Sequence, residues 1–216
     1  MNRICSTMIA LILCPLLPAR TAWSDEPLAG AAEPAAATDK VYGEWLIRPQ
    51  PAKGTEYRQL IETQGLPLFR EAGGRMVGWW NTLIGNLYEH VTIWEYDDMA
   101  AFEKAVGFLG KDERFAKFVA ARDPLLAGED SRFLKLAPFA ESPPLPDTSR
   151  FVIHEIHRVP LGRQTEYLKF MEKDGLPLLK KHGFRPVGPW LVAVGKWSEV
   201  TYLFGFDSLA ERDRLI

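Results

Sequence analysis

The residues best suited to chemistry lie in one short stretch, from His90 to Tyr96. Alternate residues of a strand share a face, so His90, Thr92, Trp94 and Tyr96 would point the same way. A histidine among aromatic side chains could act as a base or as an axial haem ligand. We therefore take His90 as the candidate catalytic residue. The candidate ligand-binding residues are Trp80, His90, Trp94 and Tyr96, which would line a pocket.

The aromatic residues of this stretch also have a simpler interpretation. Such side chains often fill the interface between two packed sheets without binding anything. His90 has no evident partner to orient its ring, and metal-binding or catalytic histidines usually have one. We favour the packed interface and keep the pocket as the functional alternative.

The remaining histidines and the cysteines predict no metal site. His154 and His157 are three residues apart in a stretch with strand character, which sends their side chains to opposite faces. Both cysteines, Cys5 and Cys14, lie near the start of the chain. Sequence motifs for a serine nucleophile, a phosphate-binding loop and a zinc protease are all missing.

The first 24 residues have the features of a signal peptide. Arg3 precedes an apolar run from Met8 to Leu17, and small residues precede Asp25. The run is too short to cross a bilayer as a helix, so we expect cleavage, a periplasmic or secreted protein and no stable membrane anchor. Residues 25–40, rich in alanine and proline, predict a flexible tether. The formal charge of −2 gives no electrostatic reason to expect nucleic acid as a partner.

The chain contains a tandem repeat. Residues 55–104 and 165–214 align without a gap, each residue with the one 110 positions later. The shared residues include Thr-Glu-Tyr at 55–57 and 165–167, Gly-Leu-Pro-Leu at 65–68 and 175–178, Trp80 with Trp190, and Glu89 with Glu199. A period this long exceeds that of solenoid repeats, so each copy should be a small domain. Val200 occupies the position of His90, so a site built on this histidine would not occur twice.

Each copy follows the order of a ferredoxin-like fold. The first copy predicts strands at 41–47, 75–84, 89–96 and 131–139, with helices at 55–72, from 97 onward, and around 115–119. Gly85-Asn86 should join two of these strands tightly, and Pro67 should interrupt its helix. The order β-α-β-β-α-β predicts an α+β fold with helices on one face of an antiparallel sheet.

These patterns give the expected domain boundaries. The first domain covers residues 41–139, a proline-rich linker covers 140–150, and the second domain covers 151–216. The second copy reaches only the start of its second helix, so we expect it to be incomplete. Either the chain is a fragment of a longer one or another chain completes the copy, and the second domain should be the less stable.

Several motifs resemble the NIPSNAP family. They are Gly-Leu-Pro-Leu at 65–68, Val-Gly-Trp-Trp at 77–80, His-Val-Thr-Ile-Trp-Glu-Tyr-Asp-Asp-Met-Ala at 90–100, Asp-Glu-Arg-Phe at 112–115, Asp-Pro-Leu-Leu at 123–126 and Ser-Arg-Phe-Leu at 131–134. The resemblance implies a dimeric α+β barrel, in which two ferredoxin-like units pack sheet against sheet around a shared interior. Relatives in that superfamily include small monooxygenases and haem-using enzymes, but the family itself has no firmly assigned reaction.

The sequence therefore favours an exported, non-enzymatic module that binds a small molecule or another protein. It would associate with itself through its sheet faces, within the chain or as a homodimer, and could take a small apolar or aromatic ligand without a cofactor. One alternative is a monooxygenase-like enzyme that uses the barrel interior, with or without haem. Another is a structural partner protein.

Overall fold

The computed structural model describes residues 39–140 and 149–215. The expected signal peptide at 1–24, most of the tether at 25–40 and most of the linker at 140–150 lie outside the described residues, so these three expectations stay predictions. Within the described part, no helix is long and apolar enough to cross a membrane.

The first copy contains four strands and four α-helices. In chain order they are β1 (Val41–Pro49), α1 (Gly54–Leu60), a π-helical turn (Ile61–Gly65), α2 (Leu66–Glu71), β2 (Arg75–Asn81), β3 (His90–Tyr96), α3 (Met99–Leu109), α4 (Glu113–Arg122), a 3₁₀ turn (Asp123–Leu125) and β4 (Leu126–Leu136).

The second copy repeats this order as far as the described residues extend. It consists of β5 (Phe151–Arg158), α5 (Gln164–Phe170), a π-helical turn (Met171–Gly175), α6 (Leu176–Lys181), β6 (Arg185–Val194), β7 (Glu199–Phe206) and α7 (Leu209–Leu215).

The proline in each copy interrupts its helix, as the sequence predicts. Pro67 and Pro177 lie in the first turn of α2 and α6, where a missing N–H donor costs little. The turn before each proline is π-helical. In contrast, the tight connection expected at Gly85-Asn86 is wrong, because β2 ends at Asn81 and β3 begins only at His90.

One antiparallel sheet of seven strands joins the two copies, in the order β2-β3-β1-β4-β6-β7-β5. The junction is the pair of β4 and β6, in which Leu136 lies opposite Trp190. The expected α+β fold of two ferredoxin-like units is therefore confirmed, and the two units share a sheet within one chain.

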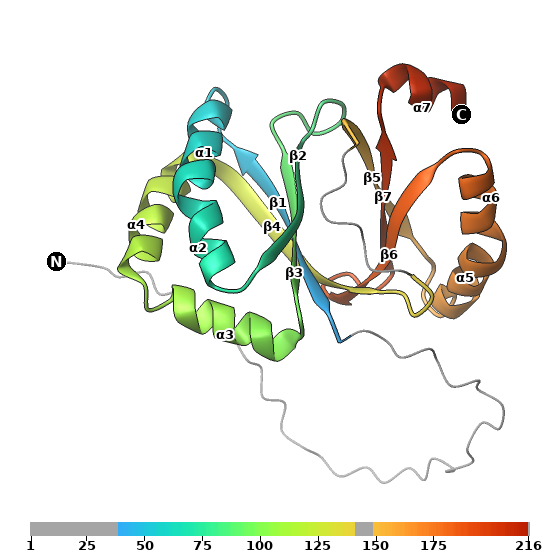
Figure 1. Ribbon diagram of the computed structural model, residues 1–216, viewed down its shortest axis with the longest axis horizontal. Coiled ribbons are helices and arrows are strands. Elements are labelled where there is room, and N and C mark those ends of the chain that lie inside the picture. Colours follow the sequence, from blue (N-terminus) through green and yellow to red (C-terminus); the bar gives the residue numbers. More distant parts are fainter. Residues whose placement is uncertain (1–38, 141–148, 216) are drawn as a thin grey trace, which may run out of the picture. The chain divides into compact units, whose positions relative to one another are not determined.

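The sheet separates an interior from two helical layers. Helices α1 to α4 cover the outer face of the first copy, and α5 and α6 cover that of the second (Figure 1). On the opposite face, apolar side chains of both copies form one buried cluster that includes Tyr42, Ile93, Leu134 and Trp190. The rings of Tyr42 and Trp190 lie edge to face at 5.9 Å. The shared interior that the family resemblance implied is thus present.

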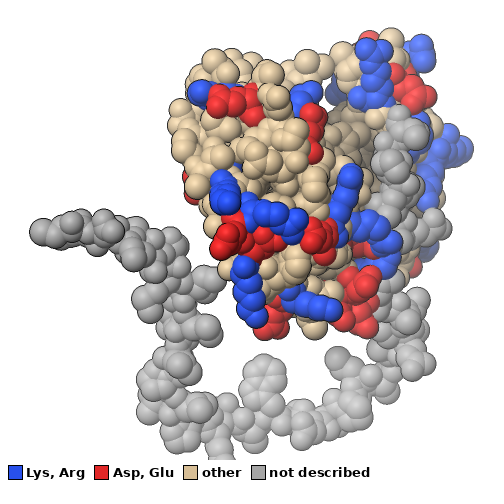
Figure 2. All heavy atoms as spheres, turned by 60° about the vertical axis from the view of Figure 1, so that its left-hand side comes forward, with Lys and Arg blue, Asp and Glu red and all other residues tan. Residues whose placement is uncertain are grey.

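Charged side chains of both signs are interspersed on the face of the molecule shown in Figure 2. Several form ion pairs at the surface, such as Arg114 with Glu71 and Arg122 with Asp123. An interspersed pattern produces no extended field of one sign.

Candidate functional site

The aromatic face of β3 lies under the helices and not in the interior. Trp94 and Tyr96 form a buried cluster with residues of α2 and α3, whereas Ile93 belongs to the interior cluster. The expectation that His90, Trp94 and Tyr96 face a barrel interior, or a second sheet, is therefore wrong. Strand alternation groups residues on one face, but it does not say which face the helices cover.

Trp80 lies apart from the other three candidate residues. It packs against the interior cluster, because the pairing register of β2 and β3 shifts between Met76 and Gly78. The structure thus keeps Trp94 and Tyr96 together and separates Trp80 from them by the thickness of the sheet.

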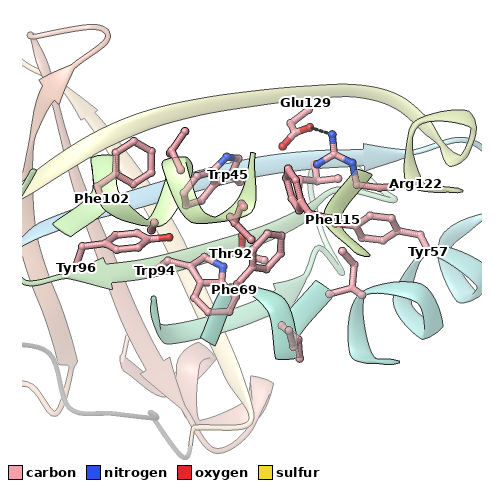
Figure 3. A pocket seen from close by; sticks show the side chains of 16 residues that line it. Trp45, Tyr57, Phe69, Thr92, Trp94, Tyr96, Phe102, Phe115, Arg122 and Glu129 are labelled. Carbon is pink, nitrogen blue, oxygen red and sulfur yellow. Dashed lines mark ion pairs between the residues drawn. The ribbon is translucent and has the colours of Figure 1, made fainter. Parts of the chain in front are cut away.

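A pocket of about 210 Å³ lies between β3 and the helices of the first copy. Figure 3 shows its labelled side chains, which come from β1, β3 and β4 and from the helices that cover them. The lining residues are Trp45, Ile47, Tyr57, Ile61, Leu66, Phe69, Thr92, Trp94, Tyr96, Phe102, Ala105, Val106, Leu109, Phe115, Arg122 and Glu129. Most of these side chains are apolar or aromatic, so the pocket suits an apolar occupant.

Aromatic contacts hold the walls of this pocket. The ring of Phe69 on α2 meets Trp94 edge to face at 5.4 Å, and Phe102 on α3 meets Tyr96 in the same way at 5.2 Å. Such pairs favour fixed ring orientations beyond the burial of area alone. The walls of the pocket are therefore held by contacts within the protein itself.

Few polar groups reach the pocket. Burial raises the pKa of Tyr96 to about 12, so its hydroxyl stays protonated near neutral pH and can donate a hydrogen bond. Thr92 offers a second hydroxyl. Arg122 and Glu129 pair with each other at 3.1 Å. These groups can orient a ligand.

His90 lines neither this pocket nor the polar cavity on the interior side of the sheet. Its ring is packed beside those of Tyr57 and Trp79, with centroids at 5.3 and 5.9 Å. Nδ1 of His90 accepts a hydrogen bond from Nε1 of Trp79 at 3.3 Å. Burial lowers the pKa of His90 to about 4, so the ring is neutral at physiological pH.

The interior contains an ion network that the sequence reasoning missed. Arg132 on β4 donates through Nε to Glu44 on β1, through Nη1 to Glu199 on β7 at 2.7 Å, and through Nη2 to Thr201 at 3.0 Å. Glu44 and Thr201 are fully buried, and Glu199 is nearly so. The network therefore ties strands of both copies together beneath the sheet.

His154 belongs to this network. Its Nε2 lies 2.9 Å from Oε1 of Glu44. Burial alone would raise the pKa of Glu44, but His154 and Arg132 hold it below its ordinary value, so Glu44 is ionised. His157 lies on the opposite face of β5 against Tyr167, as strand alternation predicts.

A polar cavity of about 500 Å³ adjoins the network on the interior side. Its lining residues are Glu44, Leu46, Arg48, Asn86, Glu89, Asp130, Ser131, Arg132, His154, Ile156, Arg158, Gly195, Lys196 and Glu199. The only sequence signal for this cavity was the repeat of Glu89 as Glu199. The other lining residues come together only through contacts between strands that are far apart in the chain.

Comparison with known families gives one clear match. The NIPSNAP family model matches residues 47–141 and 156–215, which is more than half of the chain. No curated protein matches the chain.

Two solved structures align with part of the chain. An uncharacterized NIPSNAP-like domain protein from Burkholderia xenovorans is 27% identical, with 50% of this chain and 93% of that chain covered and a TM-score of 0.45. A NIPSNAP family protein from Agrobacterium tumefaciens is 23% identical, with 45% and 93% covered and a TM-score of 0.44.

A longer alignment is found with a protein from Fusobacterium nucleatum that is provisionally described as a monooxygenase. It covers 82% of this chain and 80% of that chain, with a TM-score of 0.58 and 12% identity. Similarity at this level of identity shows the fold alone.

Proposed function

The chain belongs to the NIPSNAP family, and we propose that it is a non-enzymatic binding module whose first copy holds a small apolar or aromatic molecule. The observation that carries this proposal is the pocket of about 210 Å³ between β3 and the helices. A cavity of about 150 Å³ with apolar walls is large enough to bind benzene. The pocket is larger than that, so a small aromatic compound of one ring or two fused rings is the class of ligand that fits best.

The lining favours binding over catalysis. Its polar groups are the hydroxyls of Thr92 and Tyr96 and the paired side chains of Arg122 and Glu129. A protonated phenol in an apolar wall provides one directional hydrogen bond, which fixes orientation. A ligand with one polar atom on a ring, such as indole, would use both features.

The haem-using alternative is supported only by similarity of fold. Such similarity is an analogy and gives no evidence of a haem-binding site. An iron porphyrin at His90 would have to displace Tyr57 or Trp79, which pack against the ring. The residue is also only 5% exposed. The surroundings of His90 therefore do not fit haem.

The test is a titration of the full chain with indole, followed by ¹⁵N-resolved chemical shifts. Wild-type protein should show saturable shifts at residues around the pocket. Thr92→Tyr and Ala105→Leu should each weaken binding by at least about tenfold, because both add volume to side chains that line the pocket. Ala100→Leu is the matched control, since Ala100 is an exposed residue of the helix that carries Ala105.

Two outcomes would contradict the proposal. Indole binding that survives both pocket-filling variants would locate the ligand elsewhere. An oxidised indole product accumulating under air, and lost in Thr92→Tyr, would favour the monooxygenase-like alternative.

Export is a separate proposal, based on the signal-peptide features of residues 1–24. Expressed in a Gram-negative host, the mature protein should start at Asp25 and be found in the periplasmic fraction. N-terminal sequencing checks this, and an intact Met1 in the cytoplasmic fraction would contradict it.

Homodimer formation, the remaining proposal about partners, is tested by light scattering of the purified chain.

A further inference from the structure

The interior cavity is built from matched positions of the two copies. Pairs of residues 110 positions apart line it together, and these pairs are Glu44 with His154, Leu46 with Ile156, Arg48 with Arg158, and Glu89 with Glu199. The cavity is thus a product of both copies, and it is independent of the helix-side pocket, which belongs to the first copy alone.

The carboxylates that line this cavity are already paired. Arg132 binds Glu44 and Glu199 at the buried end. Nearer the solvent, Arg48 binds Asp130 at 2.7 Å and Glu89 at 3.3 Å. Among the described residues, no carboxylate of the lining therefore lacks a cationic partner.

Two cations of the lining can still donate hydrogen bonds to a ligand. Nε of Arg158 contacts Glu199 at 3.3 Å, and the side chain of Arg158 is 78% exposed. A guanidinium carries five N–H donors, so enough remain for a bidentate contact with a carboxylate. Within the part of the chain that the structure describes, the ammonium group of Lys196 makes no ion pair, and Lys196 also lines the cavity.

The same cavity has an apolar wall. Leu46 and Ile156 occupy matched positions on β1 and β5, and each lies two residues before the arginine of its strand, Arg48 or Arg158. A ligand held by Arg158 would place its hydrocarbon part against these side chains. The four paired carboxylates nearby disfavour a multiply charged anion, because like charges repel across a low-dielectric space.

We propose that the interior cavity binds a small organic anion with one carboxylate and a short hydrocarbon chain. Arg158 and Lys196 hold the carboxylate, and Leu46 and Ile156 contact the chain. The buried pairing of Arg132 with Glu44 and Glu199 keeps the strands of both copies at the spacing that this site needs.

The test uses the full chain and butyrate as the probe, at low ionic strength, with ¹⁵N-resolved chemical shifts as the readout. Butyrate should bind saturably in wild type, and Arg158→Gln should weaken it by about tenfold because the bidentate contact is lost. Arg163→Gln is the matched control, since Arg163 is an exposed arginine of the same copy that pairs with Glu166 outside the cavity. Lys196→Gln should weaken binding by a smaller factor.

Further arms separate the interior cavity from the helix-side pocket and from a general anion site. Butyrate binding should persist in Thr92→Tyr, because the helix-side pocket is not involved, and this arm distinguishes failure here from failure of the proposed function. Equal affinities of wild type and Arg158→Gln, or no saturable binding by wild type, would overturn the proposal. Inorganic phosphate that binds as tightly as butyrate would overturn the assignment of a monocarboxylate.

Discussion

The two faces of the same sheet carry cavities of opposite character. On the helix side, Trp45 and Trp94 belong to an apolar pocket that one copy builds by itself. On the interior side, Glu44 and Arg132 belong to an ionic cavity that needs both copies. Adjacent residues on β1 thus serve different sites, because successive side chains of a strand point to opposite faces. A repeat can therefore keep one fold while the surface between its copies acquires a separate chemistry.

Arg132→Met should have the largest effect on the stability of the interior side. The change removes the guanidinium and leaves Glu44 and Glu199 buried without their shared partner. Breaking a buried pair from one side typically costs about 3–5 kcal/mol of unfolding free energy. Urea denaturation measures the loss. A loss below about 1 kcal/mol, closer to the range of surface substitutions, would show that the interior network does not hold the copies together.

Trp94→Ala tests the other face. Trp94 is buried against Phe69, and truncation of a buried tryptophan costs about 3 kcal/mol or more. Trp94→Ala should also weaken indole binding. In contrast, the folded fraction of Arg132→Met should bind indole as tightly as wild type. A stable Trp94→Ala protein with unchanged indole affinity would remove the helix-side pocket from consideration.

Residue patterns predict the strands and helices of this fold well. They predict poorly which face of the sheet the helices cover. Residue patterns identify the strand from 89 to 96, and its observed bounds are His90 and Tyr96. They also group Trp94 with Tyr96. They do not reveal that helices cover this face, because aromatic residues satisfy a helix layer and a second sheet equally well.

The interior site could not be predicted for a different reason. Glu44 on β1 and Arg132 on β4 lie opposite each other in the pairing of these two strands. Glu199 on β7 comes within reach of Arg132 only because β4 also pairs with β6. In the sequence, each residue looks like an ordinary charged position on a strand. The repeated glutamate at 89 and 199 was the one available hint, and it did not identify its arginine partners.

A substitution at the matched position of the second copy tests what fills the corresponding space there. Tyr202 stands where the first copy has Thr92, and its ring fills space that the smaller residue leaves open. Its hydroxyl also accepts a hydrogen bond from Tyr167 at 3.0 Å. Tyr202→Thr should cost about 2–3 kcal/mol through the cavity created. It should also raise the indole stoichiometry above that of wild type, as calorimetry would show; an unchanged stoichiometry would mean that Tyr202 is not what closes the second copy.

The smallest expected effect concerns His90 and pH. Burial lowers its pKa from the ordinary 6.5 to about 4, so the folded protein keeps the ring neutral while the unfolded chain takes up a proton below pH 6.5. Since the unfolded state then binds more protons, stability should fall as pH drops from 6.5 to 4, by an amount on the order of 2 kcal/mol.

His90→Gln removes this titration, so its free energy of unfolding should depend less steeply on pH in that window. Glu44 works in the same direction at lower pH, because its lowered pKa gives a stability that is lost as pH falls below its ordinary value of 4.5. The contributions of His90 and Glu44 to the pH dependence of stability therefore fall in different pH ranges. His182→Gln is the control, since this histidine is exposed at the end of α6. Equal pH slopes for wild type and His90→Gln between pH 6.5 and 4 would show that His90 is not held neutral, and that the helix-side face is more open to water near β2 than the ring contacts of Trp79 imply.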